Sequence, residues 1–201
     1  KNILLLIPAI GGGGAEKVAA NLSLKFAEDH HLTIVLFNEK FGKMNYAYKG
    51  EIIYLNTLPS SNLLMKIYQF IIRLYKIRKI KKQRKINVSI SFLEVMNVLN
   101  LLTKKKEKII ISVRQFRSKD NTDKTIVFYI YNFLMRKIYN KAHVVVVPSM
   151  GICDDLADNF NINKSKIKLI NNPCNYESIQ HMANEELENG YQRIFHHPVI
   201  I

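Results

Sequence analysis

The amino-acid sequence predicts an α/β fold, a Rossmann-like open parallel sheet with helices on both faces. Short aliphatic runs alternate with longer amphipathic segments at least five times along the chain. The runs at 3–7 and 143–147 are continuously apolar, which is typical of strands buried on both faces. A glycine run at 11–14 separates the first aliphatic run from the first amphipathic segment. Together these observations favour parallel strands joined by helical crossovers.

The individual elements follow from the local pattern. β-rich aliphatic runs predict strands at 3–7, 32–37, 51–55, 87–92, 108–113, 143–147 and 166–170. Apolar residues at helical spacing predict helices at 15–30, 61–85, 95–103, 123–140 and 149–159. Ser149 is expected to be the N-cap of the last of these helices. Right-handed crossovers would place a ligand crevice at the carboxyl ends of the strands.

The chain length of 201 residues allows one full domain and a piece of another. We expect a Rossmann-like domain over 1–175 and a linker with a short helix over 176–193, where the sequence turns acidic and polar. The apolar residues in 194–201 are expected to form the first strand of an incomplete second domain. Because the chain starts with Lys1 and ends in an apolar run, both ends are expected to have been trimmed from a longer protein.

The charge balance predicts an anionic partner. Lys and Arg number 30 against 16 Asp and Glu, a net charge of +14. No apolar run approaches the roughly 18–20 residues of a membrane span. No recognised nucleic-acid-binding module is present, so a nucleic acid is not expected as the partner. The histidine pairs at 30–31 and 196–197 have no spaced carboxylate or thiol partners, so no metal site is predicted.

The glycine run is the sharpest motif in the sequence. Between a buried strand and a helix start, free backbone N–H groups and the helix dipole suit a phosphate. The candidate phosphate-binding loop comprises Gly12, Gly13, Gly14, Ala15 and Glu16. Its spacing fits neither a Walker A loop nor a dinucleotide-binding fingerprint. The alternative is a flexible β–α turn that binds no ligand.

Five segments, in this order and spacing, resemble the N-terminal domain of a GT-B glycosyltransferase of family 4. They begin at the glycine run and end near the close of the predicted domain. They are Pro8–Val18, Ile90–Glu94 with Asn97, Ile111–Arg114, Val145–Ser149 and Lys168–Pro173. The resemblance spans nearly the whole chain. It is greatest to bacterial enzymes that extend lipid-linked or surface glycans.

This resemblance implies a function. The whole enzyme would move a sugar, with retention of configuration, from a nucleotide-sugar to a glycan or polyprenyl-linked acceptor. In the family, the N-terminal domain mainly holds the acceptor, and its glycine loop faces the donor phosphates. The basic pair and Glu-x7-Glu motif that bind the donor are absent from these 201 residues. The chain alone is therefore expected to be inactive, and no cofactor or metal is expected.

Four polar residues after the predicted strands 87–92 and 108–113 are candidates for binding the acceptor or a phosphate. They are Glu94, Asn97, Arg114 and Arg117. An arginine could clamp an anionic oxygen bidentately but could not act as a base. Helix capping by Glu94 and Asn97 and a solvated or ion-paired Arg114 are the alternatives. No catalytic residue is assigned.

The predicted helix at 61–85 carries nine Lys and Arg between 63 and 85 and no acidic residue. We expect Lys76, Lys79 and Lys82 to form a stripe that faces an anionic membrane. The protein would then be cytoplasmic and peripheral on the inner face of the cell membrane. The alternatives are a solvated charged face and, for the whole chain, a non-catalytic basic module that binds anionic membrane or nucleic acid.

Overall fold

The computed structural model describes residues 1–38, 46–57, 60, 62–119, 126–173 and 176–185. The chain divides into two compact units, Lys1–Asn171 and Asn172–Ile201. Helix α6 (Tyr176–Ala183) belongs to the second unit and falls within the predicted linker. The predicted strand at 194–201 lies outside the described residues.

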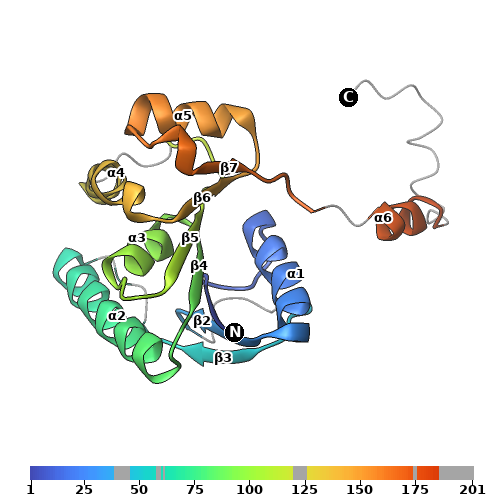
Figure 1. Ribbon diagram of the computed structural model, residues 1–201, viewed down its shortest axis with the longest axis horizontal. Coiled ribbons are helices and arrows are strands. Elements are labelled where there is room, and N and C mark those ends of the chain that lie inside the picture. The colour runs from blue at the N-terminus through green and yellow to red at the C-terminus, as the bar shows by residue number, and fades with distance from the viewer. Residues whose placement is uncertain (39–45, 58–59, 61, 120–125, 174–175, 186–201) are drawn as a thin grey trace. The chain divides into compact units, whose positions relative to one another are not determined.

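The first unit is built on a seven-stranded sheet in which every pairing is parallel. Its strand order is β3-β2-β1-β4-β5-β6-β7. Figure 1 labels each of these strands except β1. The strands are β1 (Asn2–Leu6), β2 (His31–Leu36), β3 (Glu51–Tyr54), β4 (Val88–Phe92), β5 (Lys108–Ser112), β6 (Val144–Val147) and β7 (Ile167–Leu169). The predicted fold class is confirmed.

Helices connect successive strands from β1 to β2 and from β3 to β7. They are α1 (Gly14–Asp29), α2 (Leu63–Gln83), α3 (Glu94–Leu102), α4 (Ile126–Ile138) and α5 (Met150–Phe160). Short 3₁₀ turns precede β6 at Tyr139–Lys141 and β7 at Lys164–Lys166. Ser149 occupies the N-cap position of α5, as predicted, but its side chain makes no capping hydrogen bond.

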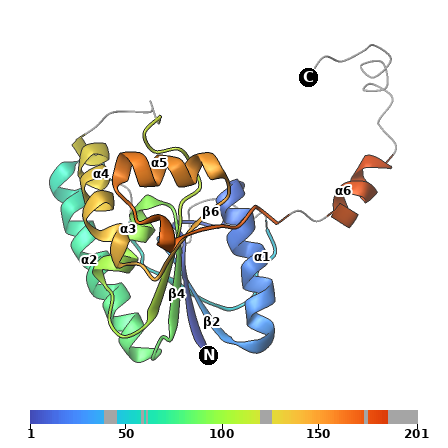
Figure 2. The ribbon, with the colours of Figure 1, turned by 45° about the horizontal axis from the view of Figure 1, so that its top comes forward.

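Both faces of the sheet are buried, which explains why β1 lacks alternating polarity. Ile3 and Leu5 pack in a cluster with α1, whereas Leu4 and Leu6 pack in a second cluster with α2 and α3. A third cluster, on the same face of the sheet as α2, packs α3, α4 and α5 against β5, β6 and β7. Figure 2 shows α1 on one face and α2, α3 and α4 on the other.

The strand order reverses between β1 and β4, which pair with each other although two strands separate them in sequence. The connection from β3 to β4 runs through α2. A reversal of this kind opens a crevice at the carboxyl ends of the two strands. The glycine loop follows β1 and the Leu93 turn follows β4, so both segments border this point.

Candidate functional site

The carboxyl edge of the sheet carries three segments that contain predicted site residues. The glycine loop follows β1, the turn at Leu93 and Glu94 follows β4, and the loop at 113–119 follows β5. All three begin where parallel strands end, so the topology brings them to one edge.

The glycine loop is closed by a residue of its own helix. Oε2 of Glu16 accepts hydrogen bonds from the backbone N–H of Gly11 at 2.7 Å and of Gly13 at 3.0 Å. A carboxylate there is stabilised by the positive end of the α1 dipole. No hydrogen bond joins the N–H groups of Gly12, Gly14 or Ala15 to another described residue. Glu16 is therefore an internal anion that leaves part of the helix terminus free.

The glycines are not required by backbone conformation. Gly50 is the one described glycine with a positive φ, so the loop glycines adopt conformations open to other residues. A Cβ added at Gly14 would meet no atom within 4 Å among the described residues. What glycine provides at position 14 is open space above the helix terminus.

The turn after β4 is strained. Leu93 has φ 68° and ψ 153°, a combination that only glycine adopts readily. This conformation turns the chain directly from β4 into α3, so that Glu94 is the first residue of the helix. Burial raises the pKa of Tyr131 and of Tyr139, and the charge of Glu94 raises both further. Glu94 is half-buried.

Asn97 does not reach the edge. It is fully buried, accepts a hydrogen bond from Ser91 Oγ at 2.7 Å and donates one to the carbonyl of Ser112 at 3.0 Å. The expected contact between Asn97 and acceptor hydroxyls therefore does not fit the structure. Its role is to join α3 to β4 and β5 beneath the site.

The two predicted arginines occupy different environments. Arg114 is half-buried, its guanidinium carbon lies 5.4 Å from the centroid of the Phe92 ring, and burial lowers its pKa. Arg117 is only 7% exposed, its Nε donates to Asn132 at 2.9 Å, and its guanidinium covers the Phe128 ring. Arg117 thus packs against α4, and Arg114 is the better placed of the two for a ligand.

Asp155 of α5 holds the loop that carries both arginines, a role that the sequence did not reveal. Its Oδ2 accepts from the backbone N–H of Arg117 at 2.8 Å and of Ser118 at 3.2 Å. Burial opposes its ionisation, but these bonds and one from Asn159 keep the pKa of Asp155 below its usual value. Gly151, four residues before Asp155 in α5, makes room for Phe116, since a Cβ there would lie 2.5 Å from the ring.

A cavity of about 320 Å³ adjoins the edge between α2, α3 and α4. It is lined by Phe37, Ser60, Lys66, Gln69, Phe70, Arg73, Val95, Val127 and Tyr131. Phe37 follows β2 and Val95 is in the first turn of α3, which places the cavity at the carboxyl end of the sheet. Sequence analysis did not single out Arg73, because nothing in a run of nine cations shows which one faces inward.

The stripe predicted on α2 is only partly exposed. Lys79 and Lys82 are exposed, but Lys76 is half-buried and its Nζ donates to the carbonyl of Leu55. The outward orientation expected of Lys76 is therefore wrong. Lys76 is anchored because Leu55, at the end of β3, lies directly beneath this turn of α2.

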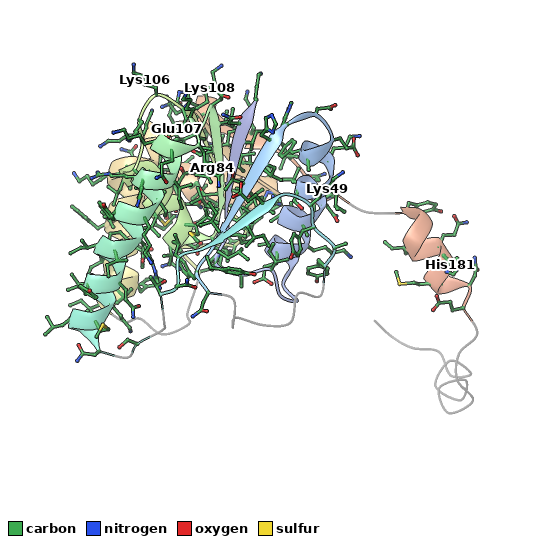
Figure 3. All side chains as sticks on the ribbon, turned by 90° about the horizontal axis from the view of Figure 1, so that it is seen from below. Lys49, Arg84, Lys106, Glu107, Lys108 and His181 are labelled. Atoms are coloured by element: carbon green, nitrogen blue, oxygen red, sulfur yellow. The ribbon has the colours of Figure 1, made fainter. Side chains whose placement is uncertain are left out.

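The cations of α2 continue onto the amino edge of the sheet. The carbonyl of Arg84, which follows α2, accepts a hydrogen bond from Asn2 at the start of β1. Lys106, in the turn between α3 and β5, and Lys108, the first residue of β5, lie nearby (Figure 3). These three cations thus lie at the end of the sheet opposite the candidate site.

One of the nine cations is buried in the core. Nζ of Lys81 lies 2.7 Å from Glu107 Oε1, and both side chains are at most 2% exposed. Lys81 also donates to the side chain of Asn100, which in turn bonds to Ser89 and Ser91. This network continues through Ser91 to Asn97, so it links the end of α2 to the floor of the site.

Two kinds of feature are absent from the described part of the chain. No helix within it is long and apolar enough to cross a membrane. Nor do its His, Cys, Asp and Glu side chains assemble in groups of three or more that could hold a metal ion.

A seven-stranded parallel sheet with a glycine loop at its switch point defines the Rossmann-like domain that forms one half of a GT-B protein. The sequence profile of Glycosyltransferase Family 4 matches residues 12–178. The chain belongs to this family.

Two relatives from Campylobacter jejuni extend undecaprenol-linked glycans, according to their names. The N-acetylgalactosamine-N,N'-diacetylbacillosaminyl-diphospho-undecaprenol 4-alpha-N-acetylgalactosaminyltransferase is 28% identical over 192 residues, 91% of this chain and 51% of its own. The GalNAc-alpha-(1->4)-GalNAc-alpha-(1->3)-diNAcBac-PP-undecaprenol alpha-1,4-N-acetyl-D-galactosaminyltransferase is 26% identical over 190 residues, 93% of this chain and 50% of its own. The chain thus spans about half the length of the curated relatives it matches.

The fold agrees with a solved structure. Anabaena Alr3699/HepE, crystallised with UDP and glucose, superposes with a TM-score of 0.60 at 12% identity. The match covers 96% of this chain and 50% of that protein. At this identity the likeness establishes the fold alone.

Proposed function

We propose that this chain is the acceptor-binding half of a glycosyltransferase that elongates a polyprenyl-diphosphate-linked glycan. One observation carries the proposal. In a family 4 chain, the glycine loop, the Glu94 turn, Arg114 and the Arg73 cavity lie at the carboxyl edge of one sheet. The names of the two Campylobacter relatives support an undecaprenyl-linked acceptor.

The donor would be a nucleotide-sugar, and the UDP in the Anabaena structure supports a uridine nucleotide. In this proposal the free N–H groups of Gly12, Gly14 and Ala15 face the donor diphosphate as its charge increases during transfer. Fixed dipoles of this kind stabilise a leaving group without reorganisation. Arg114 would add a charged donor of hydrogen bonds at the same edge.

Glu94 would bind an acceptor hydroxyl. It is half-buried at the start of α3, and the strained turn at Leu93 fixes its backbone. A carboxylate accepts hydrogen bonds from sugar hydroxyls, and the next residue, Val95, lines the cavity at this edge. The role proposed for Glu94 is to orient the acceptor sugar.

We also propose that the protein is peripheral on the inner, cytoplasmic face of the cell membrane. Besides the exposed Lys79 and Lys82, α2 exposes an apolar outer stripe at helical spacing. The stripe consists of Leu64, Tyr68, Ile71 and Tyr75, each at least 58% exposed. No acidic residue lies on α2. A basic amphipathic helix with this pattern suits an anionic bilayer surface.

The proposal is tested by sugar transfer. The 201-residue chain should transfer no sugar from a nucleotide-sugar to an undecaprenyl-diphosphate-linked saccharide, because most donor contacts would come from a second domain. The chain joined to the donor-binding half of the first Campylobacter relative should restore transfer. Transfer by the chain alone would show that it is not half an enzyme. Membrane binding without transfer by any fusion would favour a non-catalytic basic module.

A further inference from the structure

We propose that the groove between α2 and α4 holds the hydrocarbon chain of an isoprenoid diphosphate, whose phosphates bind at Arg73. This inference rests on the proposed function and deepens it, because it assigns the lipid end of the acceptor to particular residues.

The groove is apolar and is lined by side chains of α2 and α4. These two helices lie on the same face of the sheet (Figure 2). The volume of the groove is about 160 Å³. Its walls include Leu63, Ile67 and Phe70 from α2 and Ile130, Tyr131 and Leu134 from α4. A hydrocarbon chain that enters this groove would exchange water for apolar side chains on both sides, which is favourable in proportion to the area covered.

The groove leads to the polar cavity at the carboxyl edge. The two share Lys66, Phe70, Val127 and Tyr131 as lining residues, so they are contiguous. An apolar groove that opens into a cavity lined by the cations Lys66 and Arg73 matches a molecule whose hydrocarbon and anionic parts are adjacent. Free phosphate would leave the groove empty, and a plain hydrocarbon would leave the cations without a partner.

Arg73 is held in position for an anion. Its guanidinium lies 3.8 Å from the centroid of the Phe37 ring, and its Nε donates to Thr57 Oγ1 at 2.9 Å. Its terminal Nη groups make no hydrogen bond to the residues that the structure describes. These form the planar fork that binds phosphate oxygens bidentately. Burial lowers the pKa of Arg73, and a bound anion would offset that cost.

The position of the cavity then places the sugar. Val95 lines the cavity and follows Glu94, the residue proposed to bind the acceptor sugar. A diphosphate on Arg73 would therefore have its lipid substituent in the groove and its sugar substituent toward the start of α3. The apolar outer stripe of α2 is a different face of the helix and remains available to the bilayer.

The groove is tested by calorimetric titration of the 201-residue chain with farnesyl diphosphate, inorganic diphosphate and farnesol. Farnesyl diphosphate should bind at least about tenfold more tightly than inorganic diphosphate or farnesol, because it alone of the three would fill both the groove and the cavity. Arg73→Gln should weaken the binding of farnesyl diphosphate and of inorganic diphosphate by about tenfold each. Arg78→Gln, at an exposed cation five residues further along α2, is the matched control and should change the binding of neither ligand.

Ile67→Asn and Ile130→Asn should remove the advantage of farnesyl diphosphate over inorganic diphosphate. Both side chains are about half exposed, at 50% and 47%, so the fold should tolerate the changes. Ile71→Asn, on the outer stripe, is the control. It should reduce binding to vesicles of anionic phospholipid and leave farnesyl diphosphate unaffected.

Equal affinity for farnesyl diphosphate and inorganic diphosphate would contradict the proposal that the groove binds the hydrocarbon chain. An unchanged affinity in Arg73→Gln would overturn the phosphate site. A transfer-competent fusion whose KM for the lipid-linked acceptor is unaltered by Ile130→Asn would contradict this inference while leaving the proposed function intact. Tight farnesyl diphosphate binding with no transfer by any fusion would support the groove and contradict the proposed function.

Discussion

Glu16 Oε2 lies 2.7 Å from the backbone nitrogen of Gly11, five residues earlier in the chain. The carboxylate closes the glycine loop with its negative charge at the N-terminus of α1, the position that a ligand phosphate would favour. A donor phosphate must therefore bind at the N–H groups that Glu16 leaves free, or displace the carboxylate.

The substitution Gly14→Val should reduce transfer by the fused enzyme by about 10²-fold or more, the loss typical of one well-placed anion-stabilising donor. The Cβ of a side chain at this position would enter the open space above the helix terminus and meet no described atom within 4 Å. Folding, followed by circular dichroism, should be unchanged. Gly14→Ala is the smaller control. Full activity in a folded Gly14→Val protein would reduce the loop to a plain turn.

Reversing the charges of Lys79 and Lys82 to Glu should weaken binding to anionic vesicles by more than about 30-fold. Each cation near such a surface contributes about 1 kcal/mol, and the effect decays over roughly 8 Å at physiological salt. Co-sedimentation with vesicles of graded anionic lipid content measures the change. Lys25→Glu, an exposed site on α1, is the matched control. Equal vesicle binding by the Lys79 and Lys82 variant and by Lys25→Glu would show that the α2 cations form an ordinary solvated face and bind no membrane.

Asp155→Ala should destabilise the first unit by about 1–3 kcal/mol, because the backbone N–H of Arg117 would lose its buried acceptor. The native pKa of Asp155 is below its usual value, so this stability is present at neutral pH and is lost as the pH falls through that native pKa. Urea unfolding should show a difference between wild type and variant at pH 7 that narrows in strong acid. A constant difference across this range would contradict the role of the ionised carboxylate.

The substitution Glu107→Gln should cost about 3–5 kcal/mol, because it leaves the ammonium of Lys81 buried without a counter-charge. Burial already lowers the pKa of Lys81 to about 8, against the opposing effect of Glu107. The double variant Lys81→Met, Glu107→Leu should recover most of the loss. Urea unfolding checks both. Equal stability of the single and double variants would show that the pair is not the source of the cost.

The fold could be predicted from the sequence because its strands are buried on both faces. A strand such as β1 then reads as an uninterrupted aliphatic run, and the alternation of runs with amphipathic segments sets the topology. Apart from the start of the fourth helix, the helix ends lie within two residues of the predicted ones. Residues 123–125, which begin the predicted fourth helix, lie outside the described residues.

The site was predicted less well because spacing does not show where a polar side chain points. Asn97 lies after a strand end, as a binding residue would, but α3 turns it toward Ser91 and the sheet. The signal was present in the sequence. Ser89 and Ser91 interrupt an apolar strand, and Asn97 and Asn100 follow at helical spacing, a pattern typical of a buried polar network.

The sequence likewise does not show which way each cation of α2 points. Periodicity alone places Lys76, Lys79 and Lys82 on one stripe, but the end of β3 supplies a carbonyl to Lys76. Arg73 was equally hidden, since its inward position depends on Phe37 and Thr57, which are distant in sequence. Contacts between elements decide which cation binds a ligand and which meets solvent.

The central claim is that this chain holds the acceptor and contributes little to binding the donor. Calorimetric titration of the 201-residue chain with two ligands tests it most directly. These are an undecaprenyl-diphosphate-linked saccharide in detergent micelles and UDP-N-acetylgalactosamine, each measured against a micelle or buffer blank. The account predicts saturable binding of the lipid-linked saccharide and at least about tenfold weaker binding of the nucleotide-sugar. Micromolar binding of UDP-N-acetylgalactosamine, with none of the lipid-linked saccharide, would contradict it.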